Sequence, residues 1–126
     1  MLFRSGHVVN VSSVLGKRAT PGRAAYSASK AALNAMTDAL RAELGGTAIR
    51  VTLVCPGRLE DQPNGLLASS YEGAARRIVG CLHRPRRELV LTGSGRVLVA
   101  LNAVSPGIVD RIVAYWRLRE GQSQVA

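Results

Sequence analysis

The sequence predicts an α/β fold with a doubly wound, parallel sheet. Short β-branched runs typical of buried strands alternate with longer segments whose apolar residues recur at helical spacing. Strand, helix and strand in succession indicate parallel neighbours in one sheet. The predicted strands cover residues 7–13, 49–55 and 88–92, and the predicted helices cover residues 24–44, 70–83, 96–104 and 106–119.

The first predicted strand, residues 7–13, reads HVVNVSS and ends in two serines. Ligands of open α/β sheets bind beyond the carboxyl ends of the strands, so Ser12 and Ser13 are candidate functional residues. An alanine-rich helical pattern follows over residues 24–44 and stops at a glycine pair. The second predicted strand, residues 49–55, is an apolar run that ends at a Pro-Gly turn.

The rest of the chain contains a loop, a strand and three helices. Residues 58–69 are polar and are predicted to form a loop. In the helix over residues 70–83, spacing places Ala74, Ile78 and Leu82 on the apolar face, opposite two arginines. In the last helix, apolar residues share one face that we interpret as packing surface, although a membrane-surface helix or a partner-binding helix fits the same pattern. These residues are Ile108, Ile112, Val113 and Trp116.

The stretch Thr92-Gly93-Ser94-Gly95 has the first two glycines of a dinucleotide-binding fingerprint, but Leu98 occupies the third glycine position. We therefore interpret it as a turn that leads into the helix over residues 96–104.

Tyr26 and Lys30 are four residues apart at the start of the longest helical pattern. Side chains at this spacing share one helix face, about 5–6 Å apart at Cβ, so the phenol and the ammonium are expected to point into the same space. A fixed cation beside a phenol favours the phenolate and lowers its pKa, which suits a general acid or base at neutral pH. Lysine is rare here, with two Lys beside 15 Arg. A chance pairing on a surface helix is the alternative interpretation.

Composition excludes several other functions. The formal charge is +9, but the arginines are spread along the chain, and a single Phe and a single Trp offer little surface for base stacking, so no nucleic-acid partner is predicted. Cys55 and Cys81 are isolated, which predicts neither a metal site nor a disulfide. No secretory signal pattern or membrane-spanning apolar run is visible, and a cytoplasmic location is expected.

Three motifs together resemble the short-chain dehydrogenase/reductase family, and the resemblance is strong over residues 6–57. They are Asn10-Val11-Ser12-Ser13, Tyr26-Ser27-Ala28-Ser29-Lys30 and Val54-Cys55-Pro56-Gly57. The resemblance implies a Rossmann-like oxidoreductase that uses NAD or NADP and acts on a small-molecule alcohol or carbonyl substrate.

The resemblance also implies residue roles. Tyr26 would exchange a proton with the substrate oxygen, and Ser13 would hydrogen-bond the same oxygen. Lys30 would bind the nicotinamide ribose and lower the pKa of Tyr26. Ser12 is the competing serine, but the family spacing of thirteen residues to the tyrosine selects Ser13. Pro56 and Gly57 match the loop that lies along the nicotinamide.

The sequence departs from the family in two respects. Asp61 stands where the family often has a threonine that contacts the cofactor. The glycine-rich turn, the earlier strands and the catalytic asparagine of the family are not in the sequence. The resemblance therefore implies a carboxyl-terminal half, with residues 1–126 forming one partial domain and residues 93–126 a helical tail. Residues 1–7 resemble the end of a helix, and Met1 an internal methionine.

Such a half would leave one edge of its first strand unpaired and would bind cofactor poorly alone. The full-length form is expected to be a homo-oligomer that uses the outer face of the helix over residues 24–44. Two other functions stay open at this point. One is a non-catalytic partner of an intact relative, and the other is a basic protein bound to a membrane surface.

Overall fold

The computed structural model describes residues 5–63 and 67–122. In this part of the chain the main sheet has three parallel strands in the order β1-β2-β5. These strands are β1 (Ser5–Val11), β2 (Ala48–Cys55) and β5 (Glu88–Val90). The α-helices are α1 (Ala24–Glu43), α2 (Tyr71–His83), α3 (Gly93–Val104) and α4 (Pro106–Gln122). A 3₁₀ turn, η1 (Val14–Gly16), follows β1, and two short strands, β3 (Arg58–Glu60) and β4 (Ala68–Ser70), pair with each other. The predicted α/β, Rossmann-like class is therefore confirmed.

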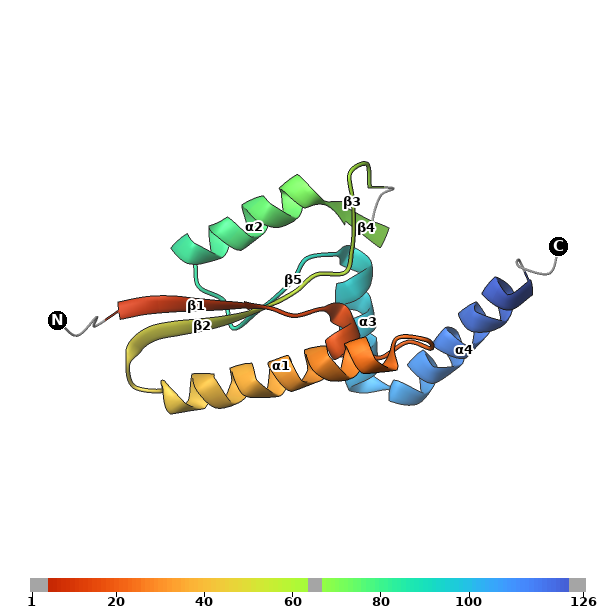
Figure 1. Cartoon of the computed structure of the whole chain (residues 1–126), viewed down its shortest axis with the longest axis horizontal. Helices are drawn as coiled ribbons and strands as arrows, with labels where there is room; N and C mark the ends of the chain where they lie inside the picture. The colour runs from red at the N-terminus through yellow and green to blue at the C-terminus, as the bar shows by residue number, and fades with distance from the viewer. Residues whose placement is uncertain (1–4, 64–66, 123–126) are drawn as a thin grey trace.

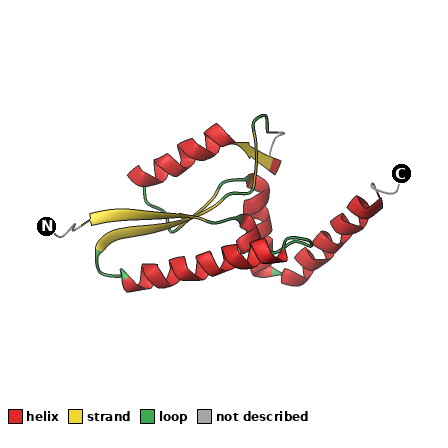
Figure 2. Ribbon diagram, in the orientation of Figure 1, coloured by secondary structure: helices red, strands yellow, loops and turns green. Residues whose placement is uncertain are grey.

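The helices form layers around the sheet. Figure 1 shows α1 on one side of the strands and α2 on the other, with α3 across their carboxyl ends and α4 leading away. The same arrangement appears by element type in Figure 2. The central strand β2 is buried at every position from 51 to 55. Cover on both faces explains why this strand reads as a continuous apolar run rather than an alternating one.

Successive residues of β2 pack into two separate hydrophobic clusters. Val54 contacts the cluster formed with Ala74 and Cys81 of α2. Leu53 and Cys55 belong to the other cluster, which Val14 and residues of α3 complete. Because neighbouring side chains of a strand point to opposite faces, one short strand serves both halves of the core.

A buried polar seam attaches α1 to β1. Thr37 is fully buried and accepts a hydrogen bond from Asn10 Nδ2 at 2.9 Å. Its own hydroxyl donates to the Leu33 carbonyl at 2.7 Å. The pairing satisfies both polar groups inside the interface and sets the position of α1 along the strand.

The first strand lies two residues earlier than predicted. It runs over Ser5–Val11 instead of residues 7–13, because the Ser12 amide makes the last hydrogen bond to β2, to the Val54 carbonyl at 2.7 Å. Ser5 to His7 are therefore strand, and the expectation that they end a helix is wrong. The rest of that expectation, residues 1–4, lies outside the described residues.

Further boundaries differ from the prediction. The third strand ends at Val90 rather than at residue 92, and α4 extends to Gln122 rather than to residue 119. The stretch predicted as a loop, residues 58–69, contains β3 and β4, which are too short to show a strand pattern; residues 64–66 lie outside the described part. The third helix begins at Gly93 rather than at residue 96, because Thr92 Oγ1 accepts a hydrogen bond from the Gly95 amide at 3.2 Å and caps it.

The structure changes the predicted faces of two helices. On α2, Ala74 is buried and Ile78 packs against the same cluster, as predicted. On α2, Leu82 is 54% exposed, whereas Arg77 turns inward and donates to the carbonyls of Leu91 and Val90. On α4, the face assigned to packing is largely exposed, and the buried residue is Val109. The exposed residues of that face are Ile108 at 48%, Ile112 at 39% and Trp116 at 61%. Helical spacing identifies a face but not the neighbour that covers it.

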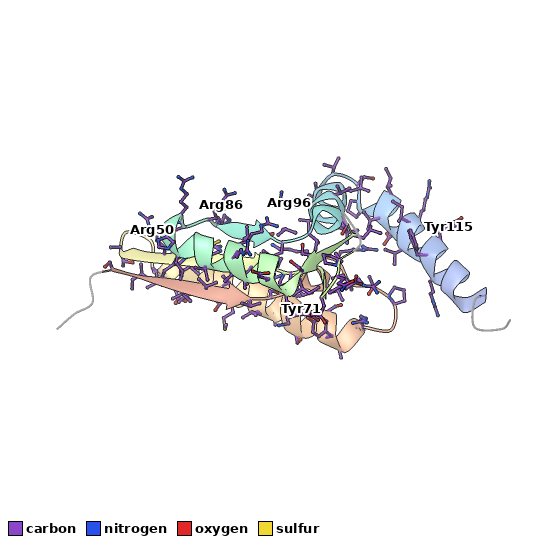
Figure 3. All side chains as sticks on the ribbon, turned by 90° about the horizontal axis from the view of Figure 1, so that it is seen from above. Arg50, Tyr71, Arg86, Arg96 and Tyr115 are labelled. Atoms are coloured by element: carbon purple, nitrogen blue, oxygen red, sulfur yellow. The ribbon has the colours of Figure 1, made fainter. Side chains whose placement is uncertain are left out.

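Within residues 5–63 and 67–122, no helix has the length and apolar character needed to cross a bilayer, and no three side chains of His, Cys, Asp or Glu form a group that could hold a metal ion. Cys55 and Cys81 are buried free thiols. The basic side chains are dispersed. Figure 3 shows Arg50, Arg86 and Arg96 spaced along the molecule, with Tyr115 beyond them on α4.

Candidate active site

Ser13 lies just beyond the carboxyl end of β1, where the chain turns into η1. Its backbone is extended, and its Oγ accepts a hydrogen bond from the Leu15 amide at 3.1 Å. Ser12 faces another way, because its hydroxyl donates to the Lys30 carbonyl on α1 at 3.2 Å. Both serines are buried, but they contact different surroundings.

Tyr26 and Lys30 lie one turn apart at the start of α1. The Lys30 Nζ is 5.8 Å from the centroid of the Tyr26 ring, so the two side chains share one face as the spacing predicts. Lys30 Nζ also donates to the Val11 carbonyl at 3.2 Å, which ties the ammonium to the end of β1. The Tyr26 side chain is 45% exposed.

A cavity of about 870 Å³ brings Ser13 and Tyr26 together. Gly57, from the turn after β2, also lines it. Neither Lys30 nor Pro56 lines the cavity. Lys30 lies one helical turn after Tyr26 on α1. The Pro56 carbonyl accepts a hydrogen bond from the Val14 amide at 2.9 Å. Asp61 is exposed and does not line the cavity.

The remaining wall comes from residues that the sequence interpretation missed. The segment before β4 and helix α3 contribute Leu67, Ser94, Gly95 and Leu98. The segment between β1 and α1 contributes Val14, Leu15 and Thr20. Thr92 lines the cavity and caps α3. The cap pattern of a threonine three residues before a helical glycine was the signal in the sequence that could have identified Thr92.

Two glycines keep this wall closely packed. A Cβ on Gly57 would lie 2.2 Å from Thr92 Oγ1, and a Cβ on Gly95 would lie 2.6 Å from the same atom. Gly95 therefore serves helix packing, and Thr92-Gly93-Ser94-Gly95 forms the cap and first turn of α3 instead of the predicted separate turn.

The cavity is electropositive. Arg23 and Arg58 line it, and no acidic side chain is among its described lining residues. Arg58 pairs with Glu60, which partly compensates its charge. A site with this balance favours a ligand that carries negative charge.

Buried Cys55 is not a nucleophile. Burial, together with the nearby carboxylate of Glu88, raises the pKa of the Cys55 thiol from 9.0 to about 11, against a smaller opposing effect of Lys17. The thiol is therefore neutral at physiological pH, and covalent catalysis by it is disfavoured.

The residues present fit one end of the nicotinamide cofactor that the family resemblance implies. Lys30 uses one donor on Val11, and Tyr26 is exposed beside it, so both can meet ribose hydroxyls. Gly57 has no side chain, so its backbone lines the cavity at a position where a Cβ would collide with Thr92. No glycine-rich turn that could hold the pyrophosphate occurs in residues 5–63 or 67–122.

Comparison with known proteins gives the same assignment as the motifs. A family model described as short chain dehydrogenase matches residues 1–72. A ketoacyl reductase, HetN, from Nostoc is 30% identical over 128 residues, which cover 89% of this chain and 45% of the relative. A dehydrogenase/reductase SDR family protein 7-like from Drosophila melanogaster is 34% identical over 128 residues, which cover 87% of this chain and 39% of the relative.

A solved structure has the same fold. The short-chain dehydrogenase from Burkholderia cenocepacia, crystallised in complex with NADP, aligns with a TM-score of 0.76 at 26% identity. The alignment covers 86% of this chain and 47% of that one. The chain thus spans about half the length of the relatives it matches, or less. On its motifs, fold and family match, the chain belongs to the short-chain dehydrogenase family.

Proposed function

We propose that this chain supplies the catalytic half of an NAD(P)-dependent oxidoreductase that interconverts an alcohol and a carbonyl compound. The observation that carries the proposal is the meeting of Ser13 and Tyr26, from separate elements, in one cavity, with Lys30 one helical turn behind. The motifs of the family and the NADP complex of the Burkholderia neighbour support it.

In this proposal Tyr26 is the general acid for carbonyl reduction and the general base for alcohol oxidation. Its exposed phenol can reach a substrate oxygen in the cavity and exchange a proton with it. Ser13 Oγ accepts from the Leu15 amide, and its hydroxyl proton has no acceptor among the described residues, so it can be donated to the same substrate oxygen. Two donors on one oxygen orient the substrate and stabilise the negative charge that develops there.

Lys30 has the role of a cofactor-binding residue. Its ammonium has three donors, and one is engaged by the Val11 carbonyl at 3.2 Å. The others are available to ribose hydroxyls beside Tyr26. Gly57 lines the cavity, and the Pro56-Gly57 turn is the segment along which the nicotinamide ring would lie if the family resemblance holds for this loop. NAD or NADP, when bound, supplies or accepts the hydride at the substrate carbon.

We also propose that these residues form the carboxyl-terminal half of the enzyme's domain. The chain spans 39% to 47% of three matched relatives. Within the described residues β1 pairs with β2 alone, so one edge of β1 has no neighbouring strand. A further polypeptide segment with a glycine-rich turn would pair with this edge and hold the pyrophosphate.

The test is Tyr26→Phe in the protein made from the gene together with the coding sequence upstream of Met1. Reduction of carbonyl compounds by NADH or NADPH should fall by about 10²-fold or more, because the proton donor is lost, while circular dichroism stays unchanged. Tyr71→Phe is the matched control, since Tyr71, labelled in Figure 3, is exposed at the start of α2 and does not line the cavity. Full turnover in Tyr26→Phe would disprove the assignment.

The outer face of α1 supports the proposal of a homo-oligomer. It exposes small alanines and Met36, which is 57% exposed. Small side chains allow two helices to approach closely, and methionine adapts to an apolar partner surface. The same face could bind an intact relative, which would make the chain on its own a non-catalytic partner; co-purification with a full-length family member separates the two.

A further inference from the structure

We propose that the substrate is an elongated, mainly apolar carbonyl or alcohol compound whose tail lies in a second cavity beside α4. This inference rests on the proposed function, because that proposal places the reacting carbonyl at Tyr26. It adds the chemical class of the substrate and the location of its tail.

The second cavity has a volume of about 660 Å³ and lies between the loop before α1, α3 and α4. It shares the lining residues Thr20, Arg23 and Leu98 with the cavity that holds Ser13 and Tyr26. Because the same three side chains border both spaces, the cavities adjoin. A molecule with its carbonyl at Tyr26 can continue past Leu98 along α4.

The second cavity has four large apolar side chains in its wall, beside polar and charged ones. The apolar side chains come from α3 and α4 and are Leu98, Ile112, Val113 and Trp116. Trp116 is 61% exposed and Ile112 is 39% exposed, so the described chain leaves much of this apolar surface in water. A hydrocarbon tail would cover it, and burial of each added methylene should improve affinity about fourfold, equivalent to about 0.8 kcal/mol.

Charge at the cavity favours a substrate tail over a bilayer as the occupant. Arg23 and Arg117 line the same space as Trp116, and a lipid interior would have to desolvate these guanidinium groups. A narrow ligand can cover the apolar wall and leave both charges in water. The cavity adjoins the candidate active site, so a substrate whose carbonyl lies at Tyr26 can also occupy it. This position favours the substrate over a second copy of the chain as the occupant.

The fluorescence of Trp116 can report binding in the second cavity, because Trp116 lines this cavity and is the single tryptophan of the sequence. The experiment titrates the protein with methyl ethyl ketone, methyl pentyl ketone and methyl octyl ketone while tryptophan emission is recorded. Emission should shift to shorter wavelength with the long ketones, and the dissociation constant should fall with every added methylene. An unchanged spectrum, or a response that does not depend on chain length, would overturn the inference.

Two isoleucines on α4 offer a matched pair of variants. Ile112 lines the second cavity, whereas Ile108, one turn earlier and also exposed, lines neither cavity. Ile112→Glu should weaken binding of methyl octyl ketone at least tenfold, and Ile108→Glu should leave it unchanged. Equal effects of the two substitutions would contradict the tail site, as would a Trp116 response to phosphatidylcholine vesicles but not to ketones.

The two proposals fail on different measurements. Trp116 emission reports occupancy of the tail site and does not need turnover, whereas Tyr26→Phe tests the chemistry. Loss of turnover in Tyr26→Phe without any chain-length dependence of Trp116 emission would leave the oxidoreductase proposal standing and remove the tail site.

Discussion

Gly57 contacts Thr92 so closely that a Cβ atom on Gly57 would lie 2.2 Å from the Thr92 Oγ1 atom. This contact joins the turn after β2 to the amino terminus of α3, and both residues line the candidate active-site cavity. The Pro-Gly motif noted in the sequence therefore has a packing role in addition to the cofactor contact implied by the family resemblance.

Gly57→Ala should destabilise the protein by about 1–3 kcal/mol, because the new methyl group must displace buried Thr92. Urea unfolding followed by circular dichroism measures the change. Gly80→Ala is the control, since Gly80 lies inside α2 and a Cβ there meets no atom within 4 Å. That substitution should stabilise the helix by about 0.5–1 kcal/mol. Similar destabilisation at both glycines would refute the close contact.

Arg77→Met should destabilise the protein by about 1–3 kcal/mol, because the carbonyls of Val90 and Leu91 lose a charged donor. Burial and the nearby guanidinium of Arg96 lower the pKa of Arg77. Thermal unfolding gives the measurement. Arg76→Met, one residue earlier, removes only an exposed ion pair with Glu72 and should change stability by less than about 1 kcal/mol.

Thr37→Val should cost about 1–3 kcal/mol, because it leaves the Asn10 amide without its acceptor in the seam between β1 and α1. Adding Asn10→Leu removes the unpaired group and should recover part of the loss. A double-mutant cycle on unfolding free energies measures the coupling. Additive effects would show that the hydrogen bond does not connect the two elements.

Stability should decline as pH rises from about 9 to about 11, because the pKa of the Cys55 thiol is raised from 9.0 to about 11 in the folded state. The unfolded chain loses the thiol proton at lower pH than the folded chain, so the stabilising contribution is complete below pH 9 and is lost towards pH 11. Urea unfolding across this range tests the prediction. Cys55→Ala should be less stable at neutral pH but should show a flatter decline; an identical decline would assign it to other groups.

Met36→Lys should shift the protein towards the monomer, because it places a charge on the outer face of α1 proposed as the subunit contact. Size-exclusion chromatography with light scattering on the protein made from the complete gene gives the molar mass. Val79→Lys is the control, because Val79 is similarly exposed, at 54%, but lies on α2. Dissociation by Val79→Lys and not by Met36→Lys would move the interface to α2.

Much of the architecture could be predicted from local patterns. Residues 24–44 and 49–55 match α1 and β2 to within one residue, because a long alanine-rich helix and a strand covered on both faces leave strong signals. Ser13, Tyr26 and Lys30 could be named as candidate site residues because their spacing follows the motifs of a family, and their roles stay a prediction. The positions of β3, β4 and Thr92 could not be predicted, since three-residue strands and a single cap give little periodic signal.

Local patterns were enough to predict the order of the three main strands and the four helices, the shared helix face of Tyr26 and Lys30, and membership of the short-chain dehydrogenase family. Each of these depends on residues close together in the chain or on motifs of defined spacing. Two findings required the folded structure. Ser13 shares a cavity with Tyr26, whereas Ser12 hydrogen-bonds to α1. Arg77 lies inward, whereas Trp116 is exposed. These outcomes depend on which distant segment packs against each side chain, and helical or strand periodicity contains no information about that partner.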